Sequence, residues 1–108
     1  MTVRELSDKL NLKVLCEGEM GREITGCYIG DLLSWVMGRA QAGNVWITIM
    51  TNMNVVAVAV LADVACVLLP ENAELDQEAL KKAEMQDVVV LQSQETAFEL
   101  AGKLSKLL

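Results

Sequence analysis

A long uncharged stretch limits what this chain can fold into. Residues 43–70 contain two short apolar runs, residues 45–50 and 64–69, separated by a third apolar segment, residues 55–62. No charged residue occurs in this stretch before Asp63. Strands that are apolar on both sides need cover on both faces of their sheet, as in parallel sheets flanked by helices. The stretch therefore predicts buried parallel strands in an α/β fold.

The middle segment of this stretch suits either a strand or a helix. Its alternation of Val and Ala at residues 55–62 fits strand propensity. A strand would leave three consecutive buried strands with almost no turn residues between them. A helix would instead form the crossover between two parallel strands, and the polar residues 51–54 offer it an N-terminal cap. We therefore predict a short, fully buried helix between two adjacent parallel strands.

The rest of the chain continues the alternation of strands and helices. The other expected strands cover residues 12–16, 23–27 and 87–91. The other expected helices cover residues 3–10, 31–41 and 76–85, and a last helix reaches the C-terminus. Together these elements predict a three-layer α/β/α fold with a mainly parallel sheet of about five strands, formed by residues 1–108 as a single domain.

Helix ends carry specific signals. Thr2 and Glu5 have capping-box spacing for the first helix. In the last helix, Ser93 is the expected cap, Glu95 the expected first-turn acid, and Glu99 and Lys103 an expected side-chain pair.

The helix predicted at residues 31–41 has its own signals. Gly30 or Asp31 is expected to cap it, and Gly43 is expected to end it. Gly38 lies inside this helix, where glycine costs about 1 kcal/mol relative to alanine. A close approach to another backbone would explain its presence.

Composition excludes several classes of function. The net charge of −6 argues against nucleic-acid binding, which needs a basic face. The chain has no His, so it lacks the usual general base and the usual catalytic triad. Its three cysteines are widely spaced and have no CxxC pair, which predicts reduced, mostly buried thiols and no metal site. We expect no catalytic residue, no metal and no cofactor.

Location and assembly follow from the same composition. The charged N-terminal residues do not resemble a signal peptide, and the longest uncharged stretch, residues 40–62, is interrupted by polar side chains. These features predict a cytoplasmic protein without a membrane span. The hydrophobic fraction of 53% is high for a small chain, and covering the surplus apolar surface with a second copy predicts a homodimer.

A ligand site is expected at one edge of the predicted sheet. In parallel α/β sheets, ligands bind beyond the carboxyl ends of the strands, close to helix N-termini. These ends are expected at residues 26–31, 51–54, 70–72 and 92–95, of which the first two are the most suggestive. The candidate ligand-binding residues are Gly26, Tyr28, Gly30, Asp31, Ser34, Thr51, Asn52 and Asn54. Their backbone, amide, hydroxyl and carboxylate groups suit a base, a ribose or a phosphate, but the same residue types also form turns and helix caps.

Three segments of the chain resemble a known domain. They read Gly-Cys-Tyr-Ile-Gly-Asp-Leu-Leu-Ser-Trp-Val-Met at residues 26–37, Gly-Asn-Val-Trp-Ile-Thr-Ile-Met-Thr-Asn-Met-Asn-Val-Val-Ala-Val-Ala at 43–59, and Ala-Phe-Glu-Leu-Ala at 97–101. In order and spacing they resemble the DRTGG domain, over about residues 12–104. That domain is similar to the N-terminal domain of HPr kinase/phosphorylase, and it occurs beside CBS domains in some inorganic pyrophosphatases and in phosphate acetyltransferases. The resemblance implies an α/β fold and a regulatory or ligand-sensing role with dimerisation and a kinase or other enzyme as partner.

The chain departs from this family in two respects. The pentapeptide that names the domain is absent, and residues 22–26, Arg-Glu-Ile-Thr-Gly, are its nearest match. The kinase half and its Gly-x-x-x-x-Gly-Lys-Ser/Thr phosphate loop are also absent. We therefore expect a non-catalytic regulatory domain for a nucleotide-like metabolite. The alternatives are a structural protein-interaction module, and a phosphotransferase or hydrolase that uses Asp31 with Thr51 or Ser34.

Overall fold

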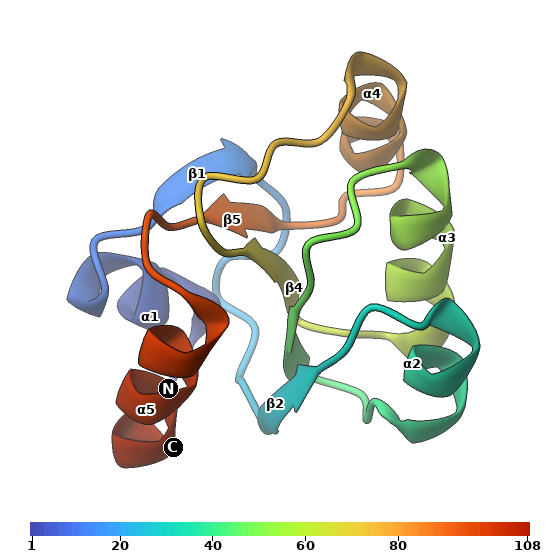
Figure 1. The fold of residues 1–108 in the computed structure, drawn as a ribbon. Coiled ribbons are helices and arrows are strands. Elements are labelled where there is room, and N and C mark those ends of the chain that lie inside the picture. Colours follow the sequence, from blue (N-terminus) through green and yellow to red (C-terminus); the bar gives the residue numbers. More distant parts are fainter.

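A single five-stranded sheet forms the middle layer of the structure, a computed structural model that describes residues 1–108 (Figure 1). The strands are β1 (Lys13–Cys16), β2 (Gly26–Ile29), β3 (Asn44–Ile47), β4 (Cys66–Leu69) and β5 (Val90–Gln92). Their order across the sheet is β1-β5-β4-β3-β2. The strands from β2 to β5 are parallel, whereas β1 pairs antiparallel with β5 at one edge. The predicted mainly parallel sheet is confirmed.

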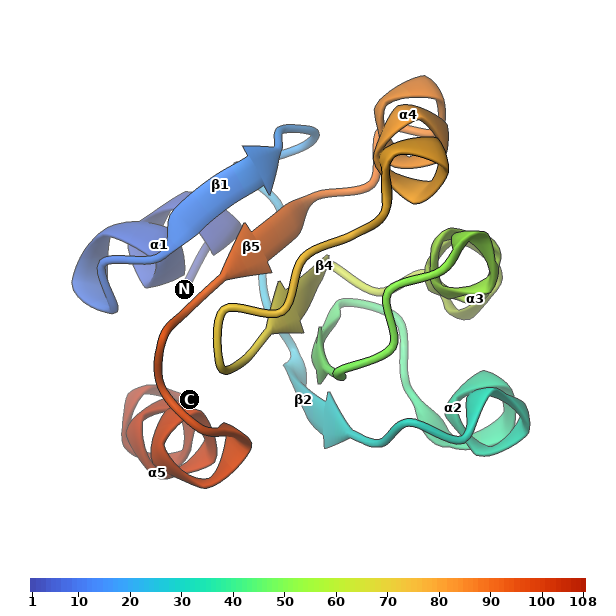
Figure 2. The ribbon, with the colours of Figure 1, turned by 45° about the horizontal axis from the view of Figure 1, so that its top comes forward.

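Five helices cover the two faces of this sheet. They are α1 (Val3–Lys9), α2 (Leu33–Arg39), α3 (Met53–Ala62), α4 (Gln77–Met85) and α5 (Ala97–Leu107). Figure 2 shows α1 and α5 on one side of the sheet and α2, α3 and α4 on the other. The arrangement confirms the predicted three-layer α/β/α fold. No helix combines the length and the apolar character that crossing a membrane requires.

Each face of the sheet has its own hydrophobic core. Along β3, Val45 and Ile47 belong to the core beneath α1 and α5, while Trp46 belongs to the core beneath α2, α3 and α4. All three side chains are fully buried, as the alternation of side chains along a strand covered on both faces requires. This double cover is the physical reason for the uncharged apolar run in the sequence.

The predicted crossover helix is present between two parallel strands. β3 and β4 are hydrogen-bonded neighbours, with Val45 opposite Cys66, and α3 connects them. Asn52 caps α3, because its Oδ1 accepts a hydrogen bond from the Asn54 N–H at 2.9 Å. The expectation that this helix is fully buried is wrong, since Leu61 is 70% exposed. As a member of an outer layer, α3 turns one side to the sheet and another to solvent.

The region around β2 and α2 differs in detail from the prediction. β2 begins at Gly26 and not at residue 23, because its ladder with β3 starts where Gly26 pairs with Asn44. α2 is shorter than predicted, and its N-cap residue Leu32 provides no side-chain hydrogen bond, so the capping role expected for Gly30 or Asp31 is wrong.

Two glycines near this helix also differ from expectation. An added Cβ at Gly38 would meet nothing within 4 Å, so the expected backbone approach is absent. Gly43 does not end the helix, which closes at the C-cap residue Ala40. Gly43 lies directly before β3 and has a left-handed φ of 83°.

The last helix begins one turn later than its predicted cap. Thr96 caps α5, and Glu99 completes a capping box with it, so the prediction of Ser93 as the cap is wrong. Glu95 lies before the helix and forms an ion pair with Lys103, which replaces the expected pair of Glu99 with Lys103. The capping box predicted from Thr2 and Glu5 for α1 is confirmed.

Candidate functional site

Asp31 joins the loop after β2 to the end of β3. Its carboxylate Oδ1 accepts hydrogen bonds from the Thr48 hydroxyl at 2.8 Å and from the Ile49 N–H at 3.0 Å. Nearby, the indole Nε1 of Trp46 donates to the carbonyl of Gly30 at 2.9 Å. The loop that carries Gly30 and Asp31 is therefore held rigidly against the next strand.

Tyr28 contributes more to packing than to an open site. Its partly buried side chain packs against the core beneath α2, α3 and α4. The ring also lies close to Gly30, where an added Cβ would be 3.1 Å from the Tyr28 ring. The absence of a side chain at Gly30 thus lets the chain turn past this ring.

The residues after β3 lie together at the start of α3. The Asn52 side chain is used in capping, and the Thr51 carbonyl accepts a hydrogen bond from the Asp76 N–H at 3.2 Å. Asn52 and Asn54 are exposed, as is Ser34 in the first turn of α2. These groups can offer amide and hydroxyl hydrogen bonds to a molecule at the carboxyl edge of the sheet.

Gly26 does not join this group. It is the first residue of β2, whereas Gly30 and Asp31 follow the last residue of that strand. Gly26 therefore lies at the amino edge of the sheet, opposite the other candidates. It lines a small cavity between β2 and the end of α5 instead.

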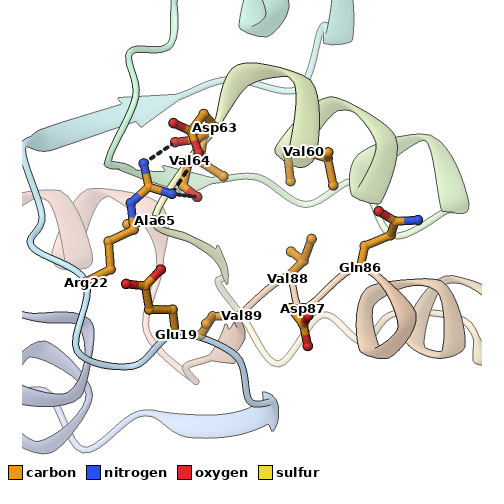
Figure 3. A pocket seen from close by; sticks show the side chains of 11 residues that line it. Glu19, Arg22, Val60, Asp63, Val64, Ala65, Gln86, Asp87, Val88 and Val89 are labelled. Atoms are coloured by element: carbon orange, nitrogen blue, oxygen red, sulfur yellow. Dashed lines mark hydrogen bonds and ion pairs between the residues drawn. The ribbon is translucent and has the colours of Figure 1, made fainter.

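A cavity of about 160 Å³ lies at this amino edge, between the end of α3 and the chain before β5 (Figure 3). On one side of it, Arg22 donates from Nη1 to the Asp63 carboxylate and from Nη2 to the Asp63 carbonyl, both at 2.8 Å. A weaker contact of 3.5 Å joins Nη1 to the Val64 carbonyl. The hydrogen bond from Arg22 lowers the pKa of Asp63, and burial opposes this effect in part. Arg22 therefore holds the carboxyl end of α3 against the segment before β2.

Residues 22–26, the nearest match to the family pentapeptide, make a second structural contact through Thr25. The Thr25 hydroxyl donates to the Ala42 carbonyl at 2.8 Å and accepts from Asn44 Nδ2 at 3.2 Å. An added Cβ at Gly43 would lie 2.7 Å from Thr25 Cγ2, too close for any side chain. Arg22 and Thr25 together attach the segment before β2 to the ends of α3 and β3.

A larger polar cavity, of about 440 Å³, lies at the carboxyl ends of β4 and β5. Its polar lining includes Asn11, Lys13, Asn72, Ser93, Glu95 and Lys103. None of the eight predicted ligand residues lines it. Residues 70–72 and 92–95 were among the expected strand ends, but Asn11, Lys13 and Lys103 were missed. They come from the neighbourhood of β1 and from α5, and no local sequence pattern brings these segments to β5.

The loops at this cavity hold each other in place. The Glu71 N–H donates to the Glu95 carbonyl at 2.9 Å, and the Asn72 N–H donates to the Ser93 carbonyl at 2.8 Å. The buried Gln92 donates from Nε2 to the carbonyls of Asn72 and Ala73, at 3.2 and 3.0 Å. The carboxyl ends of β4 and β5 therefore form a cross-linked polar platform.

The titratable side chains offer no activated thiol. Burial raises the pKa of Cys66 to about 12, with a smaller effect from the charge of Cys27. Cys27 itself is exposed, so the prediction of buried thiols holds for Cys16 and Cys66 alone. Burial, followed by the charges of Glu84 and Asp87, also raises the pKa of Cys16. A thiol with a raised pKa is a poor nucleophile near neutral pH. No group of three or more His, Cys, Asp or Glu side chains is placed to hold a metal ion.

Comparisons with known proteins agree with this fold. The model of the DRTGG domain family matches residues 5–107. A similar solved structure is that of the CBS and DRTGG domains of the regulatory region of Clostridium perfringens pyrophosphatase, in complex with the activator diadenosine tetraphosphate. The TM-score is 0.70 at 13% sequence identity, and the match covers 95% of this chain and 45% of that one. The chain thus spans less than half of that regulatory region. No curated protein matches the chain.

Proposed function

The chain belongs to the DRTGG domain family, and from that premise we propose that it is a regulatory domain that binds a nucleotide-like metabolite and catalyses no reaction itself. The similar structure belongs to a regulatory region in complex with a nucleotide activator, which supports a ligand of this class. The observation that carries the proposal is the carboxyl edge of the sheet, where Asp31 locks two loops together beside exposed polar side chains.

The ligand would bind at the corner formed by the loops after β2 and β3. Asp31 and the Trp46 indole fix the first loop, so little conformational freedom is lost when a ligand binds to it. The exposed side chains of Ser34, Asn52 and Asn54 supply donors and acceptors for a base or a ribose. The Asp31 carboxylate links the two loops through Oδ1, and this structural role accounts for the residue without the phosphotransferase or hydrolase alternative.

A thermal-shift experiment with ATP, GTP and diadenosine tetraphosphate tests this proposal. A ligand at one hundred times its dissociation constant stabilises the folded state by about 2.7 kcal/mol, which raises the Tm of a domain of this size by about 10 °C. We expect the double variant Ser34→Ala/Asn54→Ala to lose this shift. Gln41→Ala removes an exposed amide at the amino edge and should retain it. A wild-type Tm unchanged by all three nucleotides would refute ligand sensing of this kind.

The proposal also covers assembly and location. We propose that residues 1–108 are one domain, which forms a homodimer and passes its ligand state to a kinase or another enzyme. Exposed apolar side chains at the carboxyl end of the edge strand β2 and in the loops beside it, namely Ile29, Leu32 and Ile49, favour contact with a second copy. All three cysteines are free, which suits the reducing cytoplasm. Similarity to the N-terminal domain of HPr kinase/phosphorylase stays a prediction.

An interaction module without a small ligand is the second candidate. The same exposed apolar side chains favour it, because such patches mark protein contacts. A stable complex with an enzyme, formed equally well by the wild type and by Ser34→Ala/Asn54→Ala and insensitive to nucleotides, would support this alternative.

A further inference from the structure

We propose that the polar cavity at the carboxyl ends of β4 and β5, with the groove beside it between α1 and α5, binds the phosphate groups of a small phosphorylated metabolite. This site is separate from the corner that contains Ser34 and Asn54. The inference therefore goes beyond the proposed function and does not depend on it.

Positive charge is concentrated around these two cavities. Lys13 and Lys103 line the first, of about 440 Å³, and Lys9, Lys103 and Lys106 line the second, of about 390 Å³. The two cavities share Leu10 and Lys103, so they adjoin. Four of the nine basic residues of the chain thus surround one region, against a single lining carboxylate, in a protein of net charge −6. An anion is the ligand class that such a region attracts.

Most of these cations have no internal partner. Lys9, Lys13 and Lys106 form no ion pair, whereas Arg4 and Arg22 on other parts of the surface pair with Glu17 and Asp63. A lysine ammonium is a compact point charge that suits phosphate. Three unpaired ammonium groups around adjoining cavities leave a positive field that phosphate oxygens would neutralise.

Lys103 lies at the boundary of the two cavities and is held there by Glu95. The Glu95 carboxylate binds Lys103 through Oε1, while its Oε2 is buried and has no hydrogen-bond partner. An ammonium group has three donors, so this pair leaves two of them for another anion. Glu95 is therefore an internal anion with only one of its two oxygens hydrogen-bonded, and it competes with a ligand for Lys103.

The platform beneath this cavity is already formed. The hydrogen bonds between the β4–α4 and β5–α5 loops fix Asn72 and Ser93 at its rim without a ligand. Ser93 Oγ accepts from the Glu95 N–H at 3.0 Å, which leaves its own O–H free to donate to a phosphate oxygen. The volume of this cavity lies in the range of small-molecule sites, about 300–1,000 Å³.

Titration calorimetry of the full chain with sodium tripolyphosphate tests this site. We expect saturable binding that weakens about tenfold for each of Lys13→Gln and Lys103→Gln, because a charge-assisted contact is lost in each. Glu95→Gln should tighten binding, because it removes the competing anion. Lys81→Gln/Lys82→Gln removes two charges from α4 on the other side of the sheet and should leave the affinity unchanged.

The results separate this site from general electrostatics and from the corner site. No binding by the wild type, or an equal loss in the Lys81→Gln/Lys82→Gln variant, would overturn the proposal. Ser34→Ala/Asn54→Ala should bind tripolyphosphate normally whether or not nucleotides bind at the corner, and a loss in that variant would also overturn it. Circular dichroism checks the fold of each variant. If Lys103→Gln fails to fold, Lys103→Arg, which keeps the charge, must retain binding.

Discussion

At the scale of single residues, Arg22 offers a direct test of how the amino edge is held together. Its guanidinium binds both the carboxylate and the carbonyl of Asp63 at the end of α3. We expect Arg22→Ala to lower the free energy of unfolding by about 1–2 kcal/mol, a value reduced by the exposure of Asp63. Urea denaturation measures it. Arg4→Ala, which loses only a 3.9 Å surface contact with Glu17, should stay within about 0.5 kcal/mol of wild type, and equal losses would contradict the prediction.

The same contact makes stability depend on pH. The hydrogen bond from Arg22 lowers the pKa of Asp63 in the folded state below its unfolded value. A carboxyl group with a lowered folded pKa stabilises the fold fully above its unfolded pKa, about 4, and loses this contribution as pH falls through the folded value. The stability difference between wild type and Arg22→Ala should therefore shrink between pH 7 and pH 3. Urea titrations at both pH values measure it, and a constant difference would rule out this linkage.

The Cys66 thiol gives a third prediction at this scale. With a pKa of about 12, the buried Cys66 carries almost no thiolate at pH 8, where a free cysteine is substantially ionised. We expect Cys66 in the native protein to react with iodoacetamide much more slowly than Cys66 in the urea-unfolded chain, with labelling of each cysteine followed by mass spectrometry. Rapid native labelling at Cys66 would show that the sulfur is not enclosed by the core.

Residue type predicted the candidate ligand groups only in part. An acid before a helix is typical of an N-cap, yet Asp31 forms hydrogen bonds with Thr48 and Ile49, directly after the neighbouring strand β3. That contact depends on the pairing of β2 with β3, which no local pattern specifies. Asn52 behaves as its sequence position predicts, because a cap involves only its own helix.

At the scale of elements, the start of α5 depends on Thr96. Its Oγ1 accepts from the Glu99 N–H at 3.2 Å, and Glu99 Oε1 accepts from the Thr96 N–H at 3.1 Å. We expect Thr96→Ala to lower the free energy of unfolding by about 1 kcal/mol. Ser105→Ala, which removes an exposed hydroxyl near the other end of the same helix, is the matched control and should have little effect in thermal denaturation. A larger effect for Ser105→Ala would contradict the assignment of the cap.

Elements were predicted well where the signal is local and strong. The uncharged run predicted β3, α3 and β4 in the right order and direction, because burial on both faces dictates its composition. The capping box at Thr96 has the same spacing as the one predicted correctly at Thr2. That spacing alone could have predicted the start of α5. The start of β2 was predicted three residues too early, because glycine at position 26 is typical of a turn. In the structure, Gly26 pairs with β3 and is the first residue of the strand.

At the scale of the whole molecule, the position of β1 could not be predicted from the sequence. β1 comes first in the chain but pairs antiparallel with β5, the last strand. This pairing brings Lys13 opposite Gln92 and places α1 beside α5 on one face of the sheet. The lysine-lined cavities therefore exist only because the two ends of the chain meet. The sequence predicts the layers, while the long-range pairing determines where the charges gather.

The expected homodimer is also a property of the whole molecule. β2 is an edge strand, and the apolar side chains beside it are 48% exposed at Ile29, 61% at Leu32 and 55% at Ile49. Asp31, the residue before Leu32, accepts a hydrogen bond from the Ile49 N–H. This hydrogen bond holds Ile49 and Leu32 close together. We expect light scattering to give twice the chain mass for the wild type and a monomer for Ile49→Lys, since an unpaired lysine buried in the contact costs more than the contact gains. Leu61→Lys places the same charge on the exposed side of α3 and should leave the dimer intact. If Leu61→Lys dissociates the dimer while Ile49→Lys does not, the second copy binds the α3 side and the edge of β2 is free for another partner.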